Sequence, residues 1–167
     1  CIRDRLIGVV SDTHNNLLNI DKIIEIFNEK KVESVIHTGD ITKAHSLEKF
    51  SSLNCDFFAV YGNNDRNEFG LDKVAIDCNF IIQDPPMTVE RYDRKIAVFH
   101  EPEPISEFLA ADNEVDIILH GHTHRYREEY INKTLLFNPG ESAGMLKGKN
   151  AVGLIDLKNL IAKRIFF

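Results

Sequence analysis

The chain has 167 residues, enough for one domain, and carries a net charge of −6 from 20 Lys and Arg against 26 Asp and Glu. This acidic balance disfavours sequence-independent nucleic-acid binding and polybasic membrane attachment, because both need a basic surface. Three scattered cysteines form no disulfide framework or zinc knuckle, and we find neither a signal-peptide pattern nor an apolar run of membrane-spanning length, so we expect a cytoplasmic protein.

The first part of the chain alternates between predicted strands and predicted helices. Short runs rich in β-branched and aromatic residues predict strands at 6–10, 34–36 and 57–61. Between them, apolar residues spaced three and four apart predict helices over 17–31 and 46–53. Strands that alternate with helices form parallel βαβ units.

The second part adds strands that pair as hairpins. Further apolar runs predict strands at 96–99, 115–119 and 134–137. Three hairpins are expected: 87–92 with 94–99, 125–131 with 134–137, and 151–157 with 160–167. We therefore predict a single α/β domain over residues 1–167, with a mixed two-sheet core beneath helices.

Polar residues of metal-binding type follow these apolar runs. They are Asp12 and His14, Asp40, Asn63 with Asn64 and Asp65, His100, and His120 with His122 and His124. Taken alone, the first three motifs are more often a helix cap or a turn, and His100 is more often a core or surface histidine. Sites in α/β sheets form beyond the carboxyl ends of strands, however, and five such motifs in succession are unlikely to arise by chance.

The residue types favour a two-metal centre. Asp and His together suit Mn, Fe, Co, Ni or Zn better than magnesium alone. Two such ions, about 3.5–4 Å apart, need a bridging group, and Asp40 is the natural candidate because it is the only acid in its motif. A shared hydroxide would then attack phosphorus in line.

The motifs resemble those of the calcineurin-like metallophosphoesterases along nearly the full chain. The matching residues are Asp12-x-His14, Gly39-Asp40, Gly62-Asn63, His100 and Gly121-His122-x-His124. The short length and the turn Asn138-Pro139-Gly140 resemble the small phosphodiesterase subgroup of bacteria and archaea. The resemblance implies a four-layer α/β-sandwich, in which two facing mixed β-sheets are flanked by helices.

The resemblance also implies a ligand set for two divalent transition-metal ions. One ion would take Asp12, His14 and His124, the other would take Asn63, His100 and His122, and Asp40 would bridge them. Strand alternation would place His120, His122 and His124 on one face. Gly121 and the resemblance instead separate them, and His120 is expected to be a core residue or to support a ligand.

Two departures from the family pattern affect the predicted chemistry. Larger members have a histidine where this chain has Asn64, and Asn donates a hydrogen bond but no proton at neutral pH. We therefore expect esters with good leaving groups or another acid, for which Asp65 is the nearest candidate; a carboxylate that organises the turn is its alternative role. The stiff, acidic loop of residues 101–104 replaces the usual Gly-His after His100, and is expected to repel highly charged phosphates.

Arg66 and Arg125 flank the predicted site, where either would contact a phosphate or serve only as a surface charge. The favoured function is a phosphodiesterase acting on a small phosphoester through a metal-bridging hydroxide. A phosphomonoesterase and a non-catalytic scaffold resembling the retromer small subunit are the alternatives. Related small enzymes often dimerise, so a homodimer is a further expectation.

Overall fold

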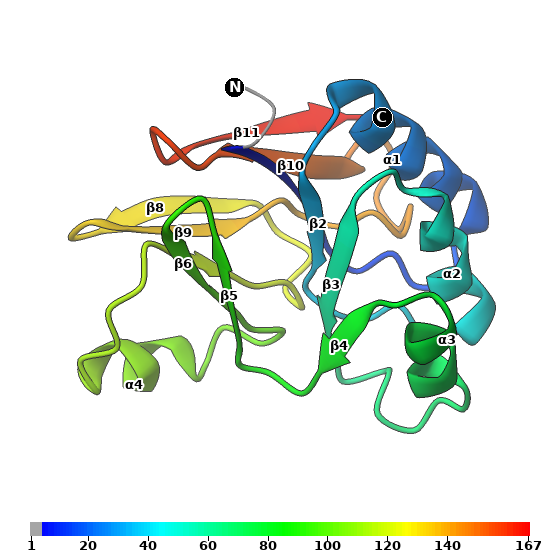
Figure 1. Ribbon diagram of the computed structural model, residues 1–167, viewed down its shortest axis with the longest axis horizontal. Helices are drawn as coiled ribbons and strands as arrows, with labels where there is room; N and C mark the ends of the chain where they lie inside the picture. The colour runs from blue at the N-terminus through cyan, green and yellow to red at the C-terminus, as the bar shows by residue number, and fades with distance from the viewer. Residues whose placement is uncertain (1–4) are drawn as a thin grey trace.

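A computed structural model describes residues 5–167 (Figure 1). Its first sheet has six strands in the order β11-β10-β1-β2-β3-β4. Their bounds are β1 Leu6–Val10, β2 Ser34–His37, β3 Asp56–Val60, β4 Ile81–Gln83, β10 Ala151–Asp156 and β11 Ile161–Phe166. The strands β1, β2, β3 and β4 are parallel, and β10 pairs antiparallel with β1. The carboxyl ends of β1, β2 and β3 therefore meet at one edge.

The second sheet has five strands in the order β5-β6-β7-β9-β8. Their bounds are β5 Met87–Arg91, β6 Arg94–Val98, β7 Ile117–Leu119, β8 Arg127–Ile131 and β9 Thr134–Asn138. The central strands β6, β7 and β9 are parallel, whereas β5 and β8 pair antiparallel at the two edges. This sheet also collects the carboxyl ends of three strands at one edge.

Three apolar clusters hold four layers together. The central cluster joins the inner faces of the two sheets, for example Ile7 and Val9 of β1 against Leu135 and Phe137 of β9. A second cluster packs the first sheet against α1 (Leu17–Lys30), α2 (Ala44–Lys49) and α3 (Leu71–Asp77). A third joins the second sheet to α4 (Ile105–Ala110), so helices lie outside both sheets, as Figure 1 shows.

The packing of α1 on β1 depends on a glycine. A Cβ atom at Gly8 would lie 2.6 Å from the Phe27 ring, so only glycine lets the helix approach this closely. Asn16 caps the start of α1 by accepting a hydrogen bond from the Asn19 backbone N–H, 3.1 Å away. The helix ends where Lys31 adopts a left-handed conformation, with φ of 55°.

The predicted architecture is confirmed: two mixed sheets are flanked by helices, and the strands fall within two residues of the predicted bounds in most cases. The predicted helix over 46–53 is divided into α2 and a 3-10 turn, Phe50–Ser52. Sequence reasoning missed α3, β4 and α4, which are three to seven residues long. Elements this short show too few periods for a pattern to be recognised.

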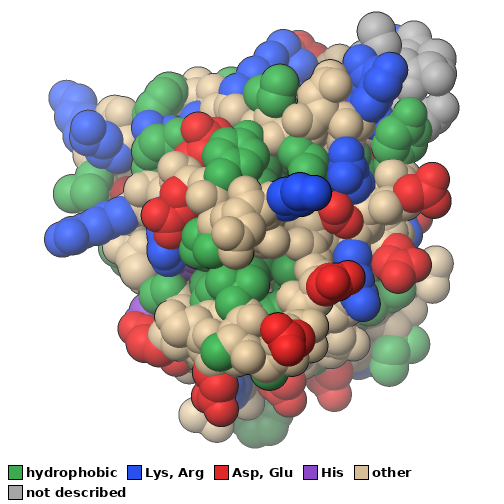
Figure 2. Space-filling view, turned by 90° about the vertical axis from the view of Figure 1, so that its left-hand side faces the viewer, with side chains coloured by type: hydrophobic (Ala, Val, Ile, Leu, Met, Phe, Trp, Pro, Cys, Tyr) green, Lys and Arg blue, Asp and Glu red, His purple; other side chains and the backbone are tan. Residues whose placement is uncertain are grey.

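The surface of the second sheet and α4 carries charges of both signs. Figure 2 shows basic and acidic side chains over this face, and its described part has no continuous basic surface. Within residues 5–167, no helix combines the length and apolar character needed to span a bilayer. Cys55 and Cys78 are free thiols, and Cys1 lies outside the described residues.

Candidate metal centre

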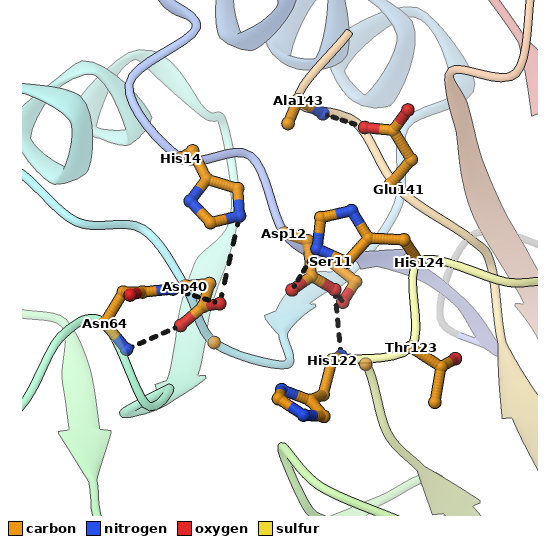
Figure 3. Close-up of polar contacts among 12 residues, drawn as sticks. Ser11, Asp12, His14, Asp40, Asn64, His122, Thr123, His124, Glu141 and Ala143 are labelled. Atoms are coloured by element: carbon orange, nitrogen blue, oxygen red, sulfur yellow. Dashed lines mark hydrogen bonds and ion pairs between the residues drawn. The ribbon is translucent and has the colours of Figure 1, made fainter. Parts of the chain in front are cut away.

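The sheet edges bring the predicted ligands together. Asp12 and His14 follow β1, Asp40 follows β2, Asn63 follows β3, His100 follows β6, and His122 and His124 follow β7. Figure 3 shows the side chains of Asp12, His14, Asp40, His122 and His124 converging from these separate loops. Asp12 and His122, for example, share one site although they are 110 positions apart in the sequence.

Asp12, His14 and His124 form the first group of donors. Their ligand atoms lie within 4.8 Å of one another, and His124 Nε2 is 3.5 Å from Asp12 Oδ1. Asp12 Oδ2 accepts hydrogen bonds from the Ser11 hydroxyl and the His122 backbone N–H, whereas Asp12 Oδ1 has no partner. His14 Nε2 is also buried without a partner. Buried polar atoms without a hydrogen-bond partner destabilise the folded protein unless a cation binds them.

Burial also raises the pKa of Asp12, although the Ser11 hydrogen bond and nearby His100 and His124 oppose this shift. A buried carboxylate is ionised readily only when positive charge lies close to it. A divalent cation at Asp12 Oδ1 would supply that charge. The electrostatic environment of Asp12 therefore fits a bound metal ion.

Asn63, His100 and His122 form the second group. His100 Nδ1 lies 2.8 Å from the Thr38 carbonyl, which only accepts, so this nitrogen is the donor of that hydrogen bond. His100 Nε2 lies 2.8 Å from Asn63 Oδ1, and His122 Nδ1 lies 3.1 Å from the same oxygen. Three lone-pair donors converging on one point fit a second cation.

Asp40 lies between the two groups. Its Oδ2 is 3.8 Å from His14 Nε2, and its Oδ1 is 3.6 Å from His100 Nε2. Asn64 donates its backbone N–H to Oδ1 and its side-chain amide to Oδ2, over 3.0 and 2.9 Å. These two bonds fix the plane of the carboxylate and leave each oxygen a lone pair facing one group, which is the geometry a bridging ligand needs.

Five of these seven residues have a left-handed backbone. The φ angles are 51° for Asp12, 46° for His14, 61° for Asp40, 67° for His122 and 58° for His124. Non-glycine residues rarely adopt this conformation, and it concentrates at functional sites. The left-handed backbone turns the side chains of one short loop toward the candidate metal centre.

Asp65, the candidate acid, is 1% exposed and is engaged by the backbone. Its Oδ2 accepts the N–H groups of Asp40 and Gly62, both at 2.8 Å, and its Oδ1 accepts the N–H of Thr42 at 2.6 Å. This geometry favours the alternative role, in which the carboxylate holds the Asp40 loop against the Asn63 loop.

Asn138 holds the His122–His124 loop in a similar way. It donates to the Gly121 carbonyl at 3.3 Å and to Thr123 Oγ1 at 3.2 Å, while its Oδ1 accepts the Gly140 N–H at 3.0 Å. Sequence reasoning used Asn138 only as part of a turn motif. Its position directly after the apolar run of β9 was the signal that it also reaches the site.

Two of the other histidines, His37 and His120, lie behind the candidate ligands. His37 is buried, with Nδ1 accepting the Gly39 N–H at 3.0 Å and Nε2 2.9 Å from Thr13 Oγ1. Burial, reinforced by His100 and His14, lowers the pKa of His37 to about 3, so it is neutral. His120 is buried beside the Gly121 carbonyl, and burial lowers its pKa as well. Both occupy supporting positions.

The two arginines differ in their relation to the site. Arg66 is exposed and lines a cavity that Asn63 and His100 also line. Arg125 is exposed, and its backbone N–H bonds to Thr123 Oγ1 at 3.3 Å. Arg66 therefore shares a cavity wall with two candidate ligands.

Comparisons with known proteins agree with this geometry. The calcineurin-like phosphoesterase superfamily domain matches residues 6–160. Phosphodiesterase MJ0936 of Methanocaldococcus jannaschii is 38% identical over 152 residues, which cover 90% of this chain and 92% of that protein. Phosphodiesterase YfcE of Escherichia coli K12 is 26% identical over 87% of this chain and 84% of its own length.

Solved structures extend the comparison. An archaeal phosphodiesterase superposes with a TM-score of 0.89 and 36% identity, over 97% of this chain and 99% of that one. Vps29 of Entamoeba histolytica, determined with zinc, has a TM-score of 0.68 at 16% identity, over 96% and 98% of the two chains. The latter likeness shows the fold alone. The family match and the archaeal relative together show that this chain belongs to the calcineurin-like phosphoesterase superfamily.

Proposed function

We propose that the protein is a dinuclear-metal phosphodiesterase. One divalent transition-metal ion would be bound by Asp12, His14 and His124, the other by Asn63, His100 and His122, and Asp40 would bind both. Family membership and the named phosphodiesterase relatives support a metal-dependent hydrolase of phosphate esters. The observation that carries the two-ion proposal is the position of Asp40, whose Oδ2 lies 3.8 Å from His14 Nε2 and whose Oδ1 lies 3.6 Å from His100 Nε2. Asp12, His14 and His124 form one group able to hold an ion, and Asp12, Asp40 and His100 form another.

Bound ions of this kind supply a nucleophile from water at neutral pH and neutralise charge that develops on phosphate oxygens. The protein's own groups would orient the reaction. Asn64 would hold the Asp40 carboxylate, and its second amide hydrogen is left for a substrate oxygen. Arg66 and Arg125 are proposed phosphate contacts, with Arg66 better placed. We propose Asp65 as a positioning residue, with leaving-group protonation as the competing role.

Elemental analysis and turnover of bis(p-nitrophenyl) phosphate test this proposal. Protein reconstituted with Mn, Ni, Co, Fe or Zn should bind about two ions per chain and hydrolyse the diester. Asp40→Ala should retain its fold, bind fewer ions and lose turnover by at least 100-fold, whereas Lys49→Ala, at a half-buried residue paired with Asp21, should behave as wild type. Full turnover in Asp40→Ala would refute the assignment.

The same measurements address the alternatives. A higher rate on p-nitrophenyl phosphate than on the diester would assign a phosphomonoesterase. Neither metal nor turnover under any loading would favour the interaction scaffold. One domain over residues 1–167, a cytoplasmic location and a homodimer remain predictions, and light scattering of the purified protein checks the last.

A further inference from the structure

A small cavity adjoins the candidate metal centre on the side of Asn63 and His100. Its volume is about 200 Å³, and both of these residues line it. The remaining wall is mostly apolar, formed by Pro85, Pro86, Phe99, Pro104 and Tyr61. A group attached to a phosphorus atom at the metal centre would therefore enter this cavity directly.

Two connections build the apolar wall. Pro85 and Pro86 lie between β4 and β5, and Phe99 and Pro104 belong to the connection from β6 to α4. Phe99 is 2% exposed, and its ring packs edge-on against Phe108 with centroids 5.2 Å apart. The wall is stiff, because proline rings fix their own backbone and Phe99 is held by α4. The Glu-Pro-Glu-Pro segment, which departs from the family pattern, thus shapes the cavity.

The size and composition of the cavity limit its occupant. Pockets that enclose a whole drug-sized ligand measure about 300–1,000 Å³, so this one accommodates a single ring. Proline and aromatic side chains offer flat apolar surfaces, and aromatic rings pack on such surfaces with favourable geometry. Arg66 and Glu101 add charge to the wall, and Arg66 is exposed and suited to the phosphate rather than to the ring.

We propose that this cavity binds a flat, mainly apolar ring carried on an ester oxygen of the substrate, so that the protein selects ring-bearing phosphodiesters. The inference rests on the proposed function and names the substrate class of the same site. It assigns Pro104 a direct contact with the ring, whereas Pro102 of the same loop does not line the cavity.

Calorimetric titration with two non-hydrolysable probes tests the inference by binding rather than turnover. Mn-loaded protein should bind phenylphosphonate about tenfold more tightly than methylphosphonate, which corresponds to about 1.4 kcal/mol. Pro104→Glu should reduce this ratio to near one, because a carboxylate would stand in the apolar wall. Pro102→Glu adds the same charge to the same loop and should keep the ratio near ten.

Any general repulsion between the new carboxylate and the phosphonates weakens the binding of both probes equally, so it cancels in the ratio of their affinities. Equal binding of the two probes by wild-type protein that hydrolyses diesters would overturn the inference and leave the proposed function standing. A ratio that survives in Pro104→Glu would also overturn it. If protein that holds two metal ions binds neither probe and hydrolyses no diester, the proposed function fails and the cavity assignment fails with it.

Discussion

Replacing Asp65 with asparagine separates the two roles open to this residue. The carboxylate accepts three backbone N–H groups, two through Oδ2 and one through Oδ1. The asparagine side chain would retain one carbonyl oxygen and place an NH₂ group against the remaining N–H. If the retained oxygen takes the Oδ2 position, the hydrogen bond from Thr42 is lost.

The expected cost follows from this count. A hydrogen bond to a charged group contributes about 1.5–3 kcal/mol, so Asp65→Asn should destabilise the fold by about 2 kcal/mol. In a chain of this size, that lowers Tm by about 4–8 °C. Because Asp65 also holds the Asp40 backbone, metal affinity should fall as well. Glu68→Gln is the matched control in the same loop, where a surface ion pair with Lys43 contributes less than about 1 kcal/mol.

Leaving-group dependence completes the assay. The ratio of kcat/KM for methyl p-nitrophenyl phosphate over methyl phenyl phosphate reports whether a proton is delivered to the departing oxygen. A positioning role predicts that Asp65→Asn lowers both rates together at saturating metal and leaves the ratio within about twofold of wild type. An unchanged Tm combined with a ratio raised tenfold or more would show that Asp65 is the acid, and would refute the positioning argument.

Three further predictions concern the residues around the candidate metal centre and the metal itself. The pKa of His37 is about 3 in the folded protein and about 6.5 in the unfolded chain. Its contribution to the free energy of unfolding should therefore be complete above pH 6.5 and fall by up to about 1.4 kcal/mol per pH unit as the pH drops toward 3. In urea unfolding, the free energy of His37→Gln should depend less steeply on pH over this range. Gly121→Ala and Gly8→Ala should each lower the free energy of unfolding by about 1–3 kcal/mol. The new Cβ atoms would lie 2.0 Å from Ser11 Oγ and 2.6 Å from the Phe27 ring, respectively. Only Gly121→Ala should abolish metal uptake in elemental analysis. Chelation should lower Tm by at least about 5–11 °C relative to protein with Mn at 100 times the Kd, because each filled site then adds about 2.7 kcal/mol. Equal melting curves would contradict the metal assignment.

The sequence predicted the long strands and α1 well because their patterns extend over several residues. β1 was placed with both bounds correct, and α1 with its end one residue too late, at Lys31. The error arises where Lys31 enters the left-handed region, which no apolar spacing reveals. The helices α3 and α4 were missed because each buries only one or two side chains, too few to form a stripe.

Within the site, residue types were predictable and contacts were not. Asp and His at strand ends identified the donors, since their chemistry depends on residue type. The role of Asn64 depends on a distance instead: its amide reaches Asp40 Oδ2 at 2.9 Å, which a missing family histidine does not indicate. Asp65 poses the same problem, because turn carboxylates and catalytic acids look alike in a sequence.

The left-handed residues explain why the motifs are informative only in combination. Each such conformation costs about 1–3 kcal/mol and persists only where the surroundings enforce it. Here the strained loops enforce one another through their backbones. The Asp12 N–H bonds to the Gly39 carbonyl at 3.2 Å, the His14 N–H to the Asp40 carbonyl at 2.9 Å, and the Gly121 N–H to the His100 carbonyl at 2.9 Å.

These bonds tie the loop after a strand to the loop after its neighbour within each sheet. The bond from the His122 N–H to Asp12 Oδ2, at 3.0 Å, links the loops of the two sheets. No single loop would therefore hold its ligands in place alone, and the donors become aligned only when the two sheets have packed together. A substitution in one loop should consequently disturb ligands contributed by another. The candidate metal centre is in this sense a property of the sandwich, and its histidines and aspartates acquire their geometry from contacts that lie far apart in the sequence.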